Sequence, residues 1–231
     1  MNVVAIMAHG HDIPFLCAGT LRKYRQAGHK TFIALTTGDE IPESACLEDT
    51  PVRLLGFTPG SLHDGMAERA AVLTAMRWAE ADVILTHSLF DGDSDHAHTA
   101  KLVADSMLIV SGKLHPADLP PVQKTPHVFY SDTVAGLSSE TRYGLSRYVT
   151  DTQAFYLTPG VHTNDPFEPE AYVDVSDLME LKLQLLAQEP ELAQGCEAQA
   201  RIRGIQMGCR YAECYTGHRV CGHIADFRLL P

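Results

Sequence analysis

Apolar runs of strand length alternate with amphipathic segments along the first half of the chain. The apolar runs cover residues 3–8, 30–38 and 82–87. The amphipathic segments, with apolar side chains near helical spacing, cover residues 14–28, 66–81 and 96–110. Because strands and helices take turns, the pattern predicts an α/β fold with a mostly parallel sheet and helices on both of its faces.

The second half of the chain continues this pattern less regularly. The predicted strands cover residues 127–132 and 171–176, and the predicted helices cover residues 177–188 and 196–215. Two stretches that contain proline and glycine, residues 42–60 and 116–126, are predicted to be loops. They are not domain linkers, because apolar strands resume on both sides of each. We therefore expect one domain over residues 1–231.

Composition and charge narrow the class of protein. With 231 residues and 45% hydrophobic content, the chain can bury a full core. The net charge of -11 comes from 29 acidic and 18 basic residues, and no basic cluster is present, which argues against nucleic acid and anionic membranes as partners. No stretch approaches the roughly 20 apolar residues that span a bilayer, and the amino terminus lacks a basic leader. Six irregularly spaced cysteines are typical of free thiols, so we expect a cytoplasmic protein.

Histidines and aspartates gather beyond the carboxyl ends of two predicted strands. The first strand is followed by His9, His11 and Asp12, and the strand over residues 82–87 is followed by Asp91, Asp93, Asp95 and His96. Open parallel sheets bind ligands at this edge, so the two clusters should meet there. Nitrogen and oxygen ligands suit zinc, and a catalytic zinc site needs three protein ligands and one open position. His9, Asp12 and His96 would form such a set.

The same residues also have a simpler interpretation. A histidine at a strand end is usually a surface residue, and Asp12 before Ile13 and Pro14 is a good helix N-cap in its own right. A calcium loop is rejected for the sequence "DGDSDH", because its sixth and twelfth positions hold His96 and Leu102 where Gly and Glu are needed. His98 follows His96 by two residues and would turn to another helix face, so it is not expected to be a ligand.

Four segments match, in order, the motifs of a known family. The segments are "AHGHDIPFLCAGTLRKYRQAGHKTFIALTTG", "DSDH", "YVDVSDLMELKLQLL" and "GIQMGCRYAECY". They resemble the AHPDD, HPDH, Y-V-D-I-S and Y-A-E-x-F motifs of the PIG-L/LmbE-like zinc-dependent de-N-acetylases. The resemblance covers nearly the whole chain. It implies a Rossmann-like α/β domain that hydrolyses the acetamide of a small N-acetylated amino-sugar compound.

The resemblance also implies roles for individual residues. The family's metal ligands fall on His9, Asp12 and His96, the same three that the strand-end argument selects. The Asp of HPDH falls on Asp95, where a carboxylate could orient a ligating imidazole. Asp64 in "LHDG" resembles a position near the substrate, although the Arg-x-x-Glu helix that the family places nearby is shortened here and broken by Pro51.

Two positions depart from the family pattern. The family's general base falls on His11, and its oxyanion partner or acid falls on Asp93. We expect the two side chains to face each other with their residue types exchanged, so that His11 is the base and Asp93 orients it. The open alternatives are that His11 is a fourth metal ligand or a loop residue without a catalytic role.

The sequence thus predicts a zinc-dependent N-deacetylase, with another divalent ion as an alternative to Zn²⁺. It acts on a small molecule and, by the resemblance, assembles as a homo-oligomer. Two other functions stay open: a catalytically silent relative that binds metal or ligand, and an amidase acting on a non-sugar amide. A cluster near the carboxyl terminus could hold a structural zinc, although buried thiols are the simpler expectation; it comprises Cys209, Cys214, His218, Cys221 and His223.

Overall fold

A seven-stranded mixed sheet forms the centre of the computed structural model, which describes residues 1–112, 119–132, 167 and 169–218. The strand order is β3-β2-β1-β4-β5-β7-β6. The strands are β1 (Asn2–Met7), β2 (Lys30–Thr37), β3 (Val52–Phe57), β4 (Val83–Thr86), β5 (His127–Ser131), β6 (Ala171–Asp174) and β7 (Ala212–Gly217). The five strands from β3 to β5 run parallel, whereas β7 and β6 add antiparallel pairs at one edge. The predicted mostly parallel sheet is confirmed.

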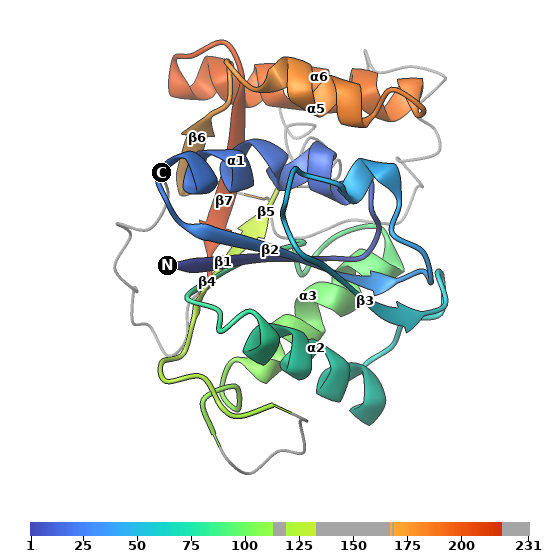
Figure 1. Ribbon diagram of the computed structural model, residues 1–231. Helices are drawn as coiled ribbons and strands as arrows, with labels where there is room; N and C mark the ends of the chain where they lie inside the picture. The colour runs from blue at the N-terminus through green and yellow to red at the C-terminus, as the bar shows by residue number, and fades with distance from the viewer. Residues whose placement is uncertain (113–118, 133–166, 168, 219–231) are drawn as a thin grey trace.

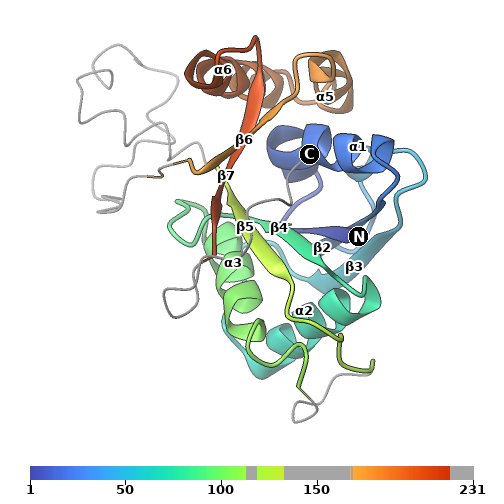
Figure 2. The ribbon, with the colours of Figure 1, turned by 90° about the vertical axis from the view of Figure 1, so that its left-hand side faces the viewer.

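Helices cover both faces of this sheet, as the pattern predicted. They are α1 (Ala18–Gln26), α2 (Met66–Trp78), α3 (Ser94–Ser106), α5 (Met179–Leu185) and α6 (Pro190–Met207), with a π-helical turn η1 (Ile13–Cys17) and a 3-10 turn η2 (Glu43–Ala45). Figure 1 shows α1, α5 and α6 on one side of the sheet and α2 and α3 on the other, and Figure 2 shows the same layers from the side. Along β1, Ala5 and Met7 join one buried cluster while Val4 and Ile6 join the other. Burial on both faces explains why the central strands are apolar throughout.

The edge strand β3 lies inside the segment that was predicted to be a loop, residues 42–60. Pro51 precedes the strand, and Gly56 adopts a positive φ of 78° within it. The register with β2 also shifts between Leu35 and Thr37. An edge strand tolerates these irregularities because it pairs on one side only. The proline and the glycine are typical of loops, and for that reason the sequence pattern did not predict this strand.

The predicted helix over residues 196–215 is wrong from residue 208 onward. Helix α6 ends at Met207, and Gly208 follows in the left-handed conformation with a φ of 89°. The chain then folds back so closely that a Cβ on Gly204 would lie 2.7 Å from the backbone of Arg210 and Tyr211. Residues 212–217 instead form β7, which lies between β5 and β6 in the sheet.

A buried ion pair fastens this carboxyl-terminal part to the rest of the fold. Lys182 on α5 pairs with Glu213 on β7, and both side chains are almost fully buried. The Glu213 carboxylate also accepts the backbone N–H groups of Gly19 and Thr20 at 3.0 and 2.7 Å. Because those N–H groups belong to the first turn of α1, one carboxylate joins α5, β7 and α1.

The described cysteines are all free thiols, as expected. Within the carboxyl-terminal cluster, the Cys214 thiol lies 3.6 Å from Asp132, and His218 Nδ1 lies 2.6 Å from the Tyr130 hydroxyl. Neither belongs to a metal-capable group among the described residues. Cys221 and His223 lie outside the described residues. No described helix is both long and apolar enough to cross a membrane.

Candidate metal centre

The loop after β1 and the first turn of α3 meet at the carboxyl edge of the sheet. Strands β1 and β4 are parallel neighbours, so the segments that follow them emerge side by side. The loop is folded back on itself, because the backbone N–H of His9 donates to the Asp12 carboxylate at 2.7 Å. Asp12 therefore does not cap the turn that follows it, contrary to its simpler interpretation. The expected meeting of the two clusters is formed, with His96 reaching His9 and Asp12.

One nitrogen of His9 and one of His96 lie close to each other and to the two carboxylate oxygens of Asp12. Nδ1 of His9 lies 3.2 Å from Nε2 of His96 and 3.4 Å from Oδ2 of Asp12. Nε2 of His96 lies 3.3 Å from Oδ1 of Asp12. Ligands about 2.0 Å from a tetrahedral zinc ion are roughly 3.3 Å apart, so these three side chains fit a divalent ion.

The outer nitrogen of each imidazole faces a carboxylate. Nε2 of His9 lies 3.4 Å from Asp95, and Nδ1 of His96 lies 3.2 Å from Asp91. Asp95 is itself held by the backbone N–H groups of Gly60 and Leu62, at 2.6 and 3.2 Å, from the loop after β3. A carboxylate on the outer nitrogen fixes ring orientation and makes an imidazole a stronger ligand. The orienting role expected for Asp95 thus has a geometric basis, and Asp91 forms the matching contact to His96.

The electrostatics of these groups favour a bound cation. Burial would raise the pKa of the Asp12 carboxyl, but His96 and His87 outweigh burial and hold this pKa well below its usual range. Burial likewise opposes a charge on His96, yet Asp12 and Asp91 raise the pKa of His96 to about 11. Without a metal, the proton on His96 partly balances the two carboxylates. A divalent ion could take the place of that proton.

His87, at the end of β4, was not identified from the sequence. Its ring is fully buried and stacks on the His96 ring, with centroids 3.9 Å apart. Nε2 of His87 lies 3.2 Å from Asp12 and accepts the backbone N–H of Ala8 at 2.9 Å. Burial lowers the pKa of His87. Donor atoms of Asp12, His87 and His96 lie close enough together to hold a metal ion, but the Nε2 lone pair of His87 is engaged by the N–H of Ala8, so we assign His87 to the support of the loop and of the His96 ring. Its place directly after a buried strand could have marked it.

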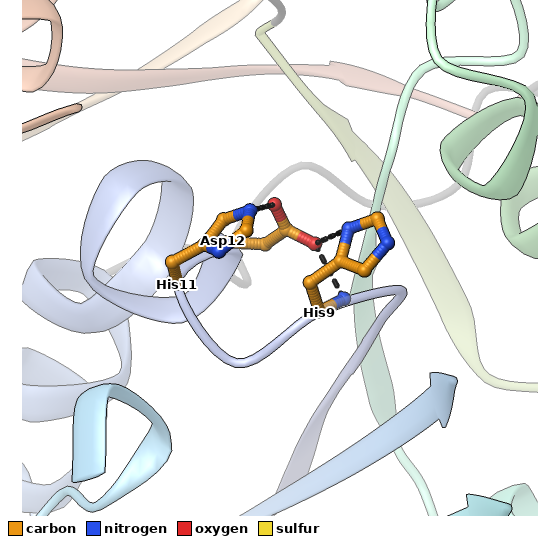
Figure 3. Close-up of side chains that lie close together, drawn as sticks. All are labelled: His9, His11 and Asp12. Carbon is orange, nitrogen blue, oxygen red and sulfur yellow. Dashed lines mark hydrogen bonds and ion pairs between the residues drawn. The ribbon is translucent and has the colours of Figure 1, made fainter. Parts of the chain in front are cut away.

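His11 and Asp93 do not form the expected pair. The Asp93 carboxylate caps α3, accepting the backbone N–H groups of Asp95 and His96 at 2.8 and 3.3 Å. Nε2 of His11 lies 3.6 Å from Asp12, on the opposite side of that carboxylate from His9 (Figure 3). Its Nδ1 lies 3.5 Å from Glu189, a residue that the sequence analysis did not consider. The Asp93 carboxylate, which was expected to orient His11, instead caps α3.

Asp64 and His98 lie apart from the three-ligand cluster. The Asp64 carboxylate pairs with Arg69 at 2.7 Å and with Lys101 at 3.6 Å, and the Arg69 contact lowers the pKa of this carboxyl. Neither residue belongs to the metal-capable groups found among the described residues. That His98 is not a ligand and that Asp64 contacts the substrate both stay predictions.

No protein-family model and no curated protein matches the sequence. Solved structures do match. The 4-carboxy-2-hydroxymuconate hydratase GalB from Pseudomonas putida has a TM-score of 0.72 at 15% identity, over 97% of this chain and 100% of the hydratase. The N,N'-diacetylchitobiose deacetylase from Pyrococcus horikoshii has a TM-score of 0.70 at 17% identity, over 98% of this chain and 87% of that one. The zinc-inhibited form of the teicoplanin deacetylase Orf2 has a TM-score of 0.59 at 11% identity, over 96% of this chain and 100% of Orf2.

The chain has the LmbE-like fold. The expected fold class is confirmed, since the deacetylases among these neighbours are of the LmbE/PIG-L type. The LmbE-like fold also occurs in a hydratase, so the reaction must be inferred from the site of this chain.

Removing any one of the three donors should abolish tight zinc binding. We expect His9→Ala, Asp12→Ala and His96→Ala each to lower zinc affinity by more than about 100-fold, beyond the loss typical of removing an orienting carboxylate. Zinc titration with a competing chelator measures this, and His98→Ala is the matched control that should keep wild-type affinity. Full affinity in any of the three variants would exclude that residue as a ligand.

Zinc binding should release protons. At pH 7 a pKa of about 11 leaves His96 protonated in the metal-free protein, and coordination requires the neutral ring. Zinc affinity should therefore fall as the pH is lowered. Calorimetry of the chelator-treated protein, in buffers with different ionisation heats, counts the protons. A binding heat that does not depend on the buffer would contradict the prediction.

Proposed function

We propose that the protein is a metal-dependent hydrolase that removes an N-acetyl group from a small amino-sugar compound, with Zn²⁺ as the first metal to test. The observation that carries the proposal is the cluster of His9, Asp12 and His96, in which each pair of side chains has nitrogen or oxygen atoms 3.2 to 3.4 Å apart. The fold supports it, because two LmbE-like neighbours are deacetylases of N,N'-diacetylchitobiose and teicoplanin.

A divalent ion held by these ligands would polarise the acetamide carbonyl and lower the pKa of a water molecule. His11 is the proposed base, because its Nε2 faces the Asp12 side of the cluster at 3.6 Å while its side chain stays partly exposed. As water adds to the carbonyl carbon, Nε2 takes the water proton. When the C–N bond breaks, the same nitrogen returns that proton to the departing amine, and the products are acetate and the amine.

The three aspartates have supporting roles in this proposal. Asp95 and Asp91 hold the outer nitrogens of His9 and His96, so that the inner nitrogens carry the free lone pairs. Asp93 acts through the backbone: by capping α3, it fixes the turn that presents Asp95 and His96. We keep Asp64 as a substrate contact at the rim, to be tested by substitution.

Hydration of a double bond is the second candidate, because the LmbE-like fold includes a hydratase whose name describes a carboxylated substrate. The described loops at the carboxyl ends of β1, β2, β3 and β4 carry several carboxylates but no lysine or arginine. These loops would repel an anionic substrate and would tolerate a neutral acetamide or a cationic amine. The charge at this edge therefore favours deacetylation. Homo-oligomeric assembly, a cytoplasmic location and the lack of nucleic-acid and membrane partners stay predictions.

The protein loaded with one equivalent of Zn²⁺ should release acetate from N-acetylglucosamine or N,N'-diacetylchitobiose. Treatment with a chelator should abolish the activity, and stoichiometric metal should restore it; excess zinc is to be avoided, because Orf2 has a zinc-inhibited form. Acetate and free amine are both measured, with 4-nitroacetanilide as a non-sugar amide. Cleavage of the anilide alone would indicate an amidase. Bound zinc without turnover of any acetamide would contradict the proposal and favour a silent binding protein.

Replacing His11 should remove the base and leave the metal in place. We expect His11→Ala to lower kcat by about 100-fold or more at unchanged zinc content, within the range typical of general-base catalysis. His29→Ala is the control, because His29 precedes β2 at the opposite edge of the sheet. Loss of zinc in His11→Ala would make His11 a fourth ligand. An unchanged kcat would make it a loop residue without a catalytic role.

A further inference from the structure

Glu189 reaches the site from a part of the chain that is far away in sequence. Its Oε2 atom lies 3.5 Å from Nδ1 of His11, while Nε2 of the same ring faces Asp12. His11 thus lies between two carboxylates that come from opposite ends of the described chain. No conserved motif or sequence pattern suggested this contact.

The position of Glu189 in its own helix makes the contact informative. Glu189 is the N-cap residue of α6, where a side chain normally accepts a backbone N–H of the first turn. Serine, threonine, aspartate and asparagine are the residues that suit this role, and glutamate is not among them. The Glu189 side chain makes no capping hydrogen bond. It faces His11 instead, so capping does not account for a carboxylate here.

The helix that carries Glu189 is fastened to the loop that carries His11. A Cβ on Gly195 would lie 3.5 Å from the ring of Phe15, so α6 packs directly on η1. The Cys196 thiol lies 3.7 Å from the carbonyl oxygen of Pro14. Lys182 donates to the carbonyl oxygen of Phe15 at 3.3 Å. These contacts hold the start of α6 and the residues after Asp12 in one packed unit.

The pair is too exposed to matter much for stability. The side chains of His11 and Glu189 are 36% and 39% exposed, and surface ion pairs of this kind contribute little to the free energy of unfolding. Its effect must therefore be sought in the orientation and the protonated nitrogen of the His11 ring. Asp12 and Glu189 compete for the ring proton, because each faces one of the two nitrogens.

We propose that Glu189 is a positioning residue for His11. Its charge holds the ring proton on Nδ1 and leaves the lone pair of Nε2 directed at the Asp12 side of the metal cluster. The Asp12 carboxylate also faces His9, His87 and His96, which compensate part of its charge. The Glu189 carboxylate therefore attracts the His11 proton more strongly than Asp12 does. The inference rests on the proposed role of His11 as the base, and it supplies the orienting carboxylate that Asp93 does not provide.

The test compares Glu189→Leu with Glu191→Leu, a matched control that removes the other carboxylate from the start of α6. With N,N'-diacetylchitobiose, Glu189→Leu should lower kcat by about 10- to 100-fold, the range typical of removing an orienting carboxylate. KM and zinc content should stay within about twofold of wild type. Glu189→Asp should recover part of the loss, and Glu191→Leu should match wild type. A kcat for Glu189→Leu equal to that of Glu191→Leu would overturn the proposal.

A second measurement does not depend on turnover. In the zinc-loaded protein labelled with ¹⁵N-histidine, the His11 ring, identified by its absence in His11→Ala, should carry its proton on Nδ1. In Glu189→Leu the proton should shift toward Nε2. A wild-type proton on Nε2, or a tautomer that Glu189→Leu leaves unchanged, would overturn the positioning role. If the expected tautomers appear but no acetamide is cleaved, the proposed function fails and the Glu189 contact stands.

Discussion

The buried charge of Asp12 is the constraint on which the arrangement of the site depends. The residue is only 3% exposed, and a carboxylate cannot remain ionised at that depth without partners that replace water. Its partners are the backbone N–H of His9 and the imidazoles of His9 and His96. To supply them, the chain turns back immediately after β1, and α3 begins beside β1 so that His96 faces inward. The local structure of both segments follows from the need to compensate one charge.

A second buried carboxylate performs a similar task behind the site. Glu213 satisfies two backbone N–H groups at the start of α1 and pairs with Lys182, so the antiparallel strand β7 and α5 are joined to α1. Breaking such a pair typically costs about 3 to 5 kcal/mol, because the remaining charge is left buried and unpaired. This attachment fixes α5 and α6 against η1, which directly follows Asp12. Through it, the carboxyl-terminal part of the chain is placed close enough to influence the His11 side of the site.

The sequence predicted the central strands and the meeting of His9, Asp12 and His96, because both depend on short-range patterns. Fully buried strands are apolar throughout, and parallel neighbours bring their following loops to one edge. The edge strand β3 and the antiparallel strand β7 were missed for the opposite reason: proline, glycine and a close backbone return interrupt their patterns. His87 and Glu189 could not be predicted from spacing. One stacks on a ring nine residues further along the chain, and the other depends on how α6 packs against η1.

The exchange of residue types at positions 11 and 93 illustrates how a local interaction can override a catalytic expectation. A carboxylate that stands just before a helix finds two unpaired backbone N–H groups within reach, and Asp93 bonds to both. His11 is therefore left without Asp93, the carboxylate that was expected to orient its ring. In the LmbE-like fold, which accommodates both deacetylases and a hydratase, the three inner donors alone cannot decide the reaction. The groups around these donors decide the reaction. One is His11, through the ring nitrogen that holds its proton, and the others are the carboxylates of the described loops at this edge, which repel anions.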